Sequence, residues 1–461
     1  MLTQIYTNSP VFFQNILITL YGYYWRNRRF GGFFGKKLIE FKERENFTAV
    51  EWTNYQTTAL RKLLVHAFTT VPFYKALYKK HGFTIHDFET FELEDLQKLP
   101  FLEKEDLRKF GTSTLLSLKR KKGTFYSSSG STGTPTELYF SREFHQTWSA
   151  LYEARVRNWA DVTYKMPRAT IGGRRVVPKA NSNPPYYRFN RAESQTYFSA
   201  YHISEVNVED YVLGLITSNA TYLVGYATSI YLLALCIEKK QLKAPPLMAV
   251  LTSSEKLTEA MRISIERVFN CKAFDGYSGV EACGLISENK FGELLFSPDS
   301  GIMEVLNDDN IPVNCGESGN VIATGLLNFD QPLIRYRIGD KVTLAVDQPK
   351  TGDNQMLKIL EIEGREEDVI RGINGSQMVR FHGVFVGIPD LLMSQVIQHT
   401  LQYIEIKLVI NANYKHISEK IMADRIKSQL GEMEIKFTYV ESIEKTKNGK
   451  YKAVISHLKH E

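Results

Sequence analysis

The chain has 461 residues, of which 43% are hydrophobic and 23% are charged. That length is too great for one compact core, so we expect a large domain and at least one smaller one. Its 57 basic and 51 acidic residues are interspersed and give a mild net charge of +6. A nucleic-acid binder usually concentrates basic residues in a stripe or motif, and neither is found, so we expect no nucleic-acid partner.

The cysteines are too few for a disulfide framework in a chain of this length, and no two of them form a CxxC pair. They are Cys236, Cys271, Cys283 and Cys315. We expect reduced, structural thiols. A zinc site that includes the last three is the alternative, although their spacing matches no common zinc motif.

A short apolar and aromatic segment, PVFFQNILITLYGYY at residues 10–24, is followed by basic and aromatic residues up to Lys37. A spanning helix needs about 20 apolar residues, and a secretory signal carries its positive charges before the apolar segment. Two interpretations are left open: a helix that packs on the globular body, and an interfacial helix within residues 10–37 that touches a membrane surface. We expect a cytoplasmic protein in both cases, membrane-associated in the second.

Apolar side chains recur at helical spacing over residues 52–69, which predicts an amphipathic helix. Pro72 is expected to end it and to begin a second short helix over residues 71–78.

Between about residue 120 and residue 363, strand-like and helical segments alternate. The strand-like residues 220–226 precede the helical residues 229–242, for example, and a second such pair follows. Alternation of this kind predicts an α/β fold with largely parallel strands. Ligands of such sheets bind beyond the carboxyl ends of strands, which is where the segments LTSSEK and GYSG are expected.

Residues 296–343 contain strand-like segments separated by turn residues, which predicts an antiparallel all-β segment. Further on, a strand over 403–410, a helix over about 416–430 and a strand over 434–440 predict a small α+β domain.

The expected fold class is therefore α/β with two domains. A large, multi-layer N-terminal domain with parallel-rich sheets and a β segment would comprise residues 1–363, of which 1–50 form an aromatic, basic and helical extension. A small, mobile α+β domain would comprise residues 364–461, joined near Gly364.

The segment YSSSGSTGTPT, at residues 126–136, has the small and flexible composition of a loop that holds phosphate. Gly130 and Gly133 permit positive φ and a close backbone approach, so that successive N–H groups can surround an anion. Hydroxyl donors are supplied by Ser127, Ser128, Ser129, Ser131, Thr132 and Thr134. No lysine follows Gly133, so the loop differs from the P-loop motif G-x-x-x-x-G-K-[ST], and a cation must come from elsewhere.

Together with four later motifs, this loop resembles the adenylate-forming superfamily, and within it the phenylacetate–CoA ligases and the CapK-like proteins of surface-polysaccharide gene clusters. The later motifs are, in the family's order, GYSGVEACG (276–284), PLIRYRIGD (332–340), EGREEDVIRGING (363–375) and KTKNGK (445–450). The resemblance extends from about residue 50 to the C-terminus. Five motifs in the same order are far more specific than any one of them.

The resemblance implies a nucleotide site. Glu281 would bind a Mg²⁺ that bridges the ATP phosphates, because hard cations prefer one or two carboxylates there. Asp340 would accept hydrogen bonds from two ribose hydroxyls, and Tyr277 would offer its ring to adenine. The remaining adenine- and ribose-binding candidates are Ser254, Glu255, Gly276 and Ser278. Arg335 and Arg337 are weaker phosphate candidates, since one of them could equally be a surface strand residue.

The same resemblance assigns the missing cation to Lys450, with Lys452 as the second candidate. Lys450 would stabilise the α-phosphate and the carboxylate during adenylation, and stabilisation of developing charge is a large catalytic term. Arg365, whose fork geometry suits phosphate, would lie near the ribose and phosphates. Glu367 stands at the hinge position, where relatives usually have Asp or Lys. His202 would contact the substrate carboxylate, with a structural role as the alternative.

The resemblance therefore implies an ATP- and Mg²⁺-dependent ligase that activates a carboxylic acid as an acyl-AMP and releases pyrophosphate. The acyl group would pass to an acceptor, either coenzyme A or an amine or hydroxyl of a surface polysaccharide. Two alternatives stay open: adenylyl transfer to a hydroxyl, and a catalytically degenerate ATP-binding partner of a membrane polysaccharide-assembly complex. The sequence identifies neither the acid, nor the acceptor, nor the oligomeric state.

Overall fold

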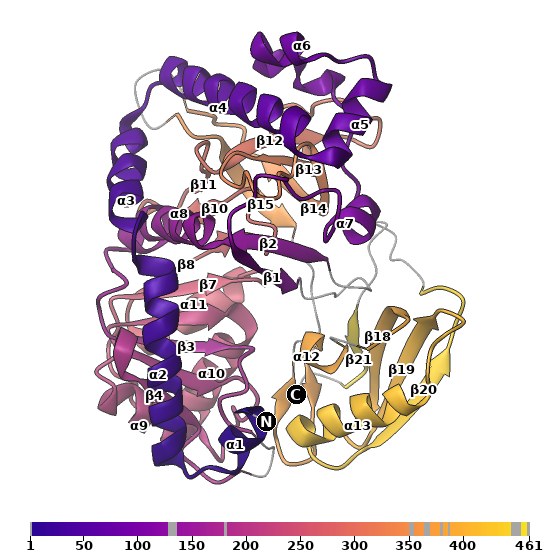
Figure 1. Ribbon diagram of the computed structural model, residues 1–461. Helices are drawn as coiled ribbons and strands as arrows, with labels where there is room; N and C mark the ends of the chain where they lie inside the picture. Colours follow the sequence, from indigo (N-terminus) through magenta and orange to yellow (C-terminus); the bar gives the residue numbers. More distant parts are fainter. Residues whose placement is uncertain are drawn as a thin grey trace.

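The structure is a computed structural model, and the residues that it describes are 2–127, 136–178, 182–349, 355–363, 369–378, 381–385, 388–443 and 453–458. Figure 1 shows a large body, in which helices flank two sheets, and a smaller C-terminal unit of orange and yellow strands beside it.

The first part of the chain is helical. Its elements are α1 (Leu2–Asn8), α2 (Val11–Phe30), α3 (Phe34–Glu43), η1 (Arg44–Asn46), α4 (Ala49–Thr70), α5 (Pro72–Lys80), α6 (Ile85–Glu89), η2 (Leu93–Lys98) and α7 (Lys104–Phe110). Helix α4 begins at a capping box in which Thr48 and Glu51 exchange hydrogen bonds, and α5 begins on Pro72. The two helices predicted for this region are confirmed.

A six-stranded sheet in the order β4-β5-β3-β6-β7-β8 forms the middle of the body. Its strands are β3 (Arg168–Gly172), β4 (Tyr187–Asn190), β5 (Gln195–Ser199), β6 (Tyr222–Tyr226), β7 (Ala249–Ser253) and β8 (Lys272–Phe274). All neighbours are parallel except β4 and β5. The flanking helices are α8 (Arg142–Tyr152), α9 (Val208–Thr217), α10 (Ala227–Lys239) and α11 (Glu259–Phe269). The predicted α/β architecture is confirmed.

An antiparallel seven-stranded sheet follows, in the order β12-β13-β14-β15-β11-β10-β9. Its strands are β9 (Gly276–Tyr277), β10 (Ile286–Glu288), β11 (Leu294–Phe296), β12 (Gly301–Leu306), β13 (Ser318–Gly325), β14 (Tyr336–Leu344) and β15 (Lys358–Glu363). The antiparallel segment predicted for residues 296–343 is therefore confirmed.

A separate hairpin joins β1 (Gly123–Ser127) to β2 (Glu137–Ser141), with Ser127 opposite Glu137. The predicted phosphate loop connects these two strands and lies outside the described residues. One hydrophobic cluster holds Leu138 and Phe140 of this hairpin together with Ala282, Cys283 and Tyr336 of the antiparallel sheet region. The hairpin, the turn after β9 and the start of β14 are therefore packed on one core.

The C-terminal unit contains a sheet in the order β20-β19-β18-β21. Its elements are β16 (Ile370–Arg371), β17 (Gln377–Met378), α12 (His382–Phe385), β18 (Leu391–Thr400), β19 (Tyr403–Ile410), α13 (Ile417–Leu430), β20 (Glu434–Tyr439) and β21 (Val454–Ser456). The strand, helix and strand predicted there are confirmed as β19, α13 and β20. The Gln377 N–H donates to the Tyr201 carbonyl of the body at 2.9 Å, and Tyr201 joins the unit's hydrophobic cluster.

The four thiols are free, and burial raises the pKa of Cys236 to about 11 and that of Cys271 to about 12, so both keep their protons. Over the described part of the chain, no three His, Cys, Asp or Glu side chains form a group that could hold a metal ion. No helix among the described residues is long and apolar enough to cross a membrane.

Candidate functional site

The parallel strands end at one edge of the six-stranded sheet, and most of the described candidate residues follow those ends. Ser254 and Glu255 come after β7, Gly276 and Tyr277 come after β8, and His202 comes after β5. Because parallel strands share a direction, these segments meet along a single edge, where α/β proteins bind ligands.

Tyr277 and Asp340 are joined directly. The Tyr277 hydroxyl donates to Asp340 Oδ2 at 2.9 Å, although the two residues are on β9 and β14. Burial and the Asp340 charge hold the pKa of Tyr277 well above its ordinary value, so the phenol keeps its proton and donates.

A β-bulge sets the position of Asp340. The register between β13 and β14 shifts between Asn320 and Ile322, and Gly339 has a φ of 89°. Such bulges re-aim a side chain, and the positive φ favours glycine at this point. The sequence Gly339-Asp340 therefore turns the carboxylate toward Tyr277 rather than along the regular strand pattern.

Glu281 lies in the turn that follows β9. A Cβ added at Gly279 would come within 2.3 Å of Glu281 Oε2, so this carboxylate folds back over a residue that has no side chain. Burial raises the pKa of Glu281, and the Asp340 charge adds to the rise. Lys104 and the Tyr336 hydroxyl act in the opposite direction.

The two carboxylates, Glu281 and Asp340, are thus close enough to raise each other's free energy when both are ionised. A divalent cation would relieve that repulsion. Mg²⁺ typically takes one or two protein carboxylates and completes its shell with water and substrate phosphate. The donor set at this corner fits such an ion.

Three residues near this corner were missed by the sequence reasoning: Lys104, Asp275 and Tyr336. Tyr336 stands inside the motif PLIRYRIGD and is fully buried at the start of β14. Lys104 begins α7, far from Glu281 in the sequence, and no local pattern connects the two.

Asp275 precedes the GYSG motif, and its carboxylate accepts from the Gly276 N–H at 2.8 Å and from Thr252 Oγ1 at 3.3 Å. Burial raises the pKa of Asp275 to about 6; the Gly276 N–H opposes this rise and the neighbouring Glu288 carboxylate adds to it. Asp275 thus titrates nearer to neutral pH than an ordinary aspartate.

The other described candidates have partners of their own. Glu255 Oε2 accepts the Thr228 N–H at 3.0 Å, in the first turn of α10. The negative charge of this carboxylate therefore stabilises the N-terminus of that helix. Ser254 has a φ of 71°, and the Ser278 hydroxyl donates to the Gly279 carbonyl at 3.2 Å. Their contacts with adenine or ribose, like that of Gly276, stay predictions.

His202 is buried, with 2% of its surface exposed. Its Nδ1 is 2.7 Å from Ser199 Oγ, and its ring stacks on Tyr186 at 4.9 Å between centroids. These contacts favour the structural alternative for His202. Its predicted contact with a substrate carboxylate is not tested.

Arg335 and Arg337 are held by protein groups. Arg335 is buried and donates to both carboxylate oxygens of Glu304, at 3.0 and 2.7 Å, and to the Leu99 carbonyl at 2.6 Å. Arg337 is the more exposed of the two and pairs with Glu103 at 3.2 Å. Arg335 thus serves the fold rather than a phosphate.

Several candidates lie outside the described residues: Ser128, Ser129, Gly130, Ser131, Thr132, Gly133, Thr134, Arg365, Glu367 and Lys450. They stay predictions. The ends of the phosphate loop are nevertheless fixed, since Ser127 Oγ donates to Glu137 Oε1 at 2.7 Å across the hairpin.

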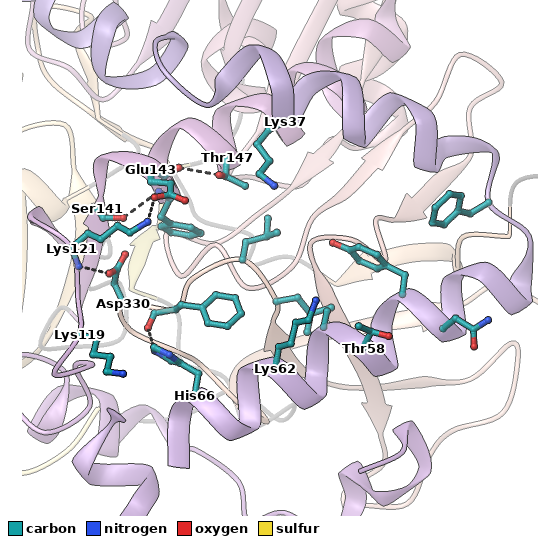
Figure 2. A pocket seen from close by; sticks show the side chains of 18 of the residues that line it. Lys37, Thr58, Lys62, His66, Lys119, Lys121, Ser141, Glu143, Thr147 and Asp330 are labelled. Atoms are coloured by element: carbon teal, nitrogen blue, oxygen red, sulfur yellow. Dashed lines mark hydrogen bonds and ion pairs between the residues drawn. The ribbon is translucent and has the colours of Figure 1, made fainter. Parts of the chain in front are cut away.

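A cavity of about 790 Å³ lies elsewhere in the body, lined by residues of α4 and α8 (Figure 2). Lys62 and His66 of α4 line it together with Lys119, Lys121 and Asp330. None of the predicted site residues is among its lining residues. The cavity is therefore distinct from the corner formed by Tyr277, Glu281 and Asp340.

Comparison with known proteins gives one family match and several relatives. Residues 373–457 match the family model of the CapK C-terminal domain. The chain is 26% identical to protein CapK of Staphylococcus aureus over the full length of both. It is 28% identical to the phenylacetate–coenzyme A ligase of Escherichia coli K12, over 69% of this chain and 72% of that enzyme.

Among solved structures, 2-hydroxyisobutyryl-CoA ligase in its postadenylation state, in complex with R3-HIB-AMP, matches with a TM-score of 0.56. The match covers 90% of this chain and 91% of that one at 16% identity, which shows a shared fold. A second structure of that ligase, in complex with 2-HIB-AMP and CoA in the thioesterification state, matches equally well at 17% identity.

Proposed function

Because the chain belongs to the adenylate-forming enzymes, as an AMP-forming ligase of the CapK and phenylacetate–CoA ligase type, we propose that it activates a carboxylic acid as an acyl-AMP. Pyrophosphate is released in this step, and the acyl group then passes to an acceptor. The observation that carries the proposal is the corner where Tyr277, Asp340 and Glu281 meet beside the hairpin that bears the Ser/Thr/Gly loop.

Each group at this corner has a part in holding ATP. The loop residues 128–134 cradle the phosphates with N–H and hydroxyl donors. Asp340 binds the ribose hydroxyls. The Tyr277 hydroxyl donates to Asp340 Oδ2 at 2.9 Å and so holds the carboxylate in position. Mg²⁺ on Glu281, when bound, neutralises charge on the phosphates.

In the first half-reaction a carboxylate oxygen of the acid attacks the α-phosphorus of ATP. A P–O bond forms to the acid, and the P–O bond to pyrophosphate breaks. Lys450 stabilises the charge that gathers on the α-phosphate, and Arg365 assists at the ribose and phosphates. Because Lys450 comes from the C-terminal part of the chain, closure of that part over ATP becomes a condition for chemistry.

In the second half-reaction the acceptor attacks the acyl carbon and AMP departs. Coenzyme A is the acceptor that the named ligases suggest. An amine or hydroxyl of a surface polysaccharide is the alternative acceptor that the resemblance of the sequence motifs implies. Movement about Glu367 would admit the acceptor after the acyl-AMP has formed.

Two other functions use the same scaffold. Transfer of AMP to a hydroxyl would leave a stable adenylylated product, and a degenerate ATP-binding partner would turn over nothing. The residue types at Glu281, Asp340, Arg365 and Lys450 favour an active ligase, because each matches the chemistry required at its position.

Pyrophosphate release, measured with ATP, Mg²⁺ and a panel of carboxylic acids, tests the proposal. We expect release that depends on an acid and that falls about 10²- to 10³-fold in Lys450→Ala, as for other groups that stabilise transition-state charge. Lys452→Ala is the matched control and is expected to keep wild-type rates. No release with any acid, or no loss in Lys450→Ala, would contradict the proposal.

A further inference from the structure

Helix α2 turns its polar side toward the protein. Asn15 Oδ1 accepts the Phe189 N–H at 2.9 Å, Gln14 Oε1 accepts from Arg188 Nε at 2.6 Å, and Arg26 donates to the Ala192 carbonyl at 3.0 Å. In the same direction Arg29 forms an ion pair with the buried Glu193. Polar contacts therefore hold α2 to β4 and to the residues that follow it.

The contact is also close. A Cβ on Gly22 would lie 2.0 Å from Asn190 Oδ1, so the middle of α2 approaches the end of β4 at a distance that only glycine permits. The packed-helix interpretation of residues 10–24 is thereby confirmed. Figure 1 shows α2 along the outside of the body.

The opposite side of α2 is apolar and exposed. Phe12 is 70% exposed and Leu20 is 61% exposed, with Ile16 between them at helical spacing. The exposed apolar residues of α2 are Phe12, Phe13, Ile16, Leu20, Tyr21, Tyr23 and Tyr24. An ordinary surface helix has the reverse arrangement, with its apolar stripe toward the core. Contiguous exposed apolar surface of this kind marks an interaction site.

The charged residues of this N-terminal segment are all basic. Residues 1–39 contain no Asp or Glu and five Lys or Arg residues. Arg26 and Lys36 are exposed there, and so are Arg142, which donates to Asn27 of α2 at 2.8 Å, and Arg191, whose N–H donates to Thr19. The apolar stripe is therefore bordered by positive charge.

We propose that the exposed face of α2 docks flat on an anionic lipid bilayer. Helices that lie in the interface bury an apolar face rich in aromatic residues and carry basic residues that meet anionic headgroups. Tyrosine suits this position because its ring is apolar and its hydroxyl reaches water. A second copy of the chain is disfavoured as the occupant, because two such faces would bring like charges together.

Helix α2 also contacts β1, the strand that precedes the predicted phosphate loop in the sequence. Arg28 of α2 donates to the Tyr126 hydroxyl at 3.1 Å, and Trp25 packs edge-on against the Tyr126 ring. Tyr126 belongs to β1, the strand that leads into the loop. Arg28 also donates to His145 Nδ1 at 3.2 Å, and burial together with the Arg28 charge lowers the pKa of His145 to about 3, so this contact holds at neutral pH.

Flotation of the full chain with vesicles tests the proposal. We expect binding to phosphatidylcholine vesicles that contain phosphatidylglycerol, weak binding to phosphatidylcholine alone, and a decrease with added salt. Substitution of Phe12, Leu20 and Tyr24 by serine should lower the bound fraction about tenfold or more, because these side chains supply the buried apolar area. Their exposure predicts an unchanged thermal midpoint for this triple variant.

A control variant removes the same number of exposed apolar residues elsewhere: Phe291→Ser, Ile311→Ser and Val346→Ser. It is expected to bind vesicles as the wild type does. The proposal is overturned if the wild type does not bind anionic vesicles, or if the α2 variant binds them equally. If the wild type and the control variant self-associate, the α2 variant does not, and none of them binds vesicles, the occupant of this face is a second copy of the chain. That result would also overturn the proposal.

Discussion

At the scale of single residues, Asp275, Glu281 and Asp340 bring three carboxylates to the end of the parallel sheet, each with different neighbours. Asp340 accepts from Tyr277, Glu281 folds over Gly279, and Asp275 is held by backbone and Thr252 donors. The charges of Asp340 and Glu281 repel each other when both are ionised, and a bound cation would relieve that repulsion. Asp275 differs from them, because burial raises its pKa to about 6.

Asp275 makes a pH-dependent contribution to stability that Asp275→Asn should remove. The folded protein keeps this proton up to about pH 6, whereas the unfolded chain releases it near the ordinary value of 3.8. Ionisation therefore costs the folded state free energy, and stability falls as pH rises across that interval, by at most about 3 kcal/mol. Chemical unfolding at a series of pH values measures this.

The wild type is expected to lose more stability than Asp275→Asn between about pH 4 and pH 6. The control is Asp309→Asn, which changes an exposed aspartate and should follow the wild type. Parallel curves for wild type and Asp275→Asn would contradict the assignment.

At this scale, site residues that stand in local motifs could be predicted from the sequence, whereas residues brought to the site by tertiary packing could not. Tyr277, Glu281 and Asp340 stand in motifs, and the structure brings these three together. Asp275 owes its pKa to burial and to Glu288, and Lys104 reaches Glu281 from another element, so neither leaves a local signal. Arg335 is in a motif but serves the fold, because its guanidinium is paired with Glu304 of β12, which β13 separates from β14 in the sheet.

At the scale of elements, the turn after β9 depends on the absence of a side chain at Gly279. A methyl group in Gly279→Ala would meet Glu281 Oε2 and push the carboxylate aside. If Glu281 holds Mg²⁺, we expect the Mg²⁺ concentration for half-maximal pyrophosphate release to rise about tenfold, as when a ligand loses its supporting group.

Gly35→Ala is the matched control, because an added Cβ there meets no atom within 4 Å. It should leave the Mg²⁺ dependence unchanged. If Gly279→Ala keeps the Mg²⁺ dependence of the wild type, Glu281 does not bind the metal.

Elements with a strong local pattern were predicted well, and the others were not. The periodic helix α4 and the buried strands β6 and β7 follow from apolar spacing alone. The long strand β18 was missed, because its apolar residues show no clear alternation and its pairing with β19 and β21 is a tertiary feature. For α2, a helix packed on the body and an interfacial helix at a membrane surface were the open alternatives; the structure shows the packed helix, with an apolar face that is exposed.

At the scale of the whole molecule, the buried Asp299 forms ion pairs that connect three regions of the chain. Its carboxylate lies 3.2 Å from Arg155, in the π-helical segment Glu153–Arg157 that follows α8, and 3.3 Å from Arg44 after α3, and it precedes β12. Asp299→Asn would leave the fully buried Arg155 without this counter-charge. We expect a loss of about 3–5 kcal/mol in the free energy of unfolding, the usual cost of breaking a buried pair.

Chemical unfolding followed by tryptophan fluorescence measures that loss, with the exposed Asp309→Asn again as control, expected within about 0.5 kcal/mol of the wild type. An Asp299→Asn variant as stable as the wild type would show that the three regions are held by other contacts.

The strand, helix and strand of the C-terminal unit were predicted from the local sequence pattern, whereas the division of the chain into two domains stays a prediction. The domain boundary near Gly364 and the roles of Arg365, Glu367 and Lys450 stay predictions as well, because these residues lie outside the described part of the chain. A local sequence pattern identifies such residues by type but does not fix their position relative to ATP.

The central claim is that a carboxylate oxygen attacks the α-phosphorus of ATP, and the fate of that oxygen tests it most directly. An acid that supports pyrophosphate release is labelled with ¹⁸O in its carboxylate and turned over with the acceptor, and the AMP is analysed by mass spectrometry. We predict AMP that carries one ¹⁸O atom, because the acceptor breaks the bond between the acyl carbon and that oxygen. Unlabelled AMP, or ADP as the nucleotide product, would contradict the account.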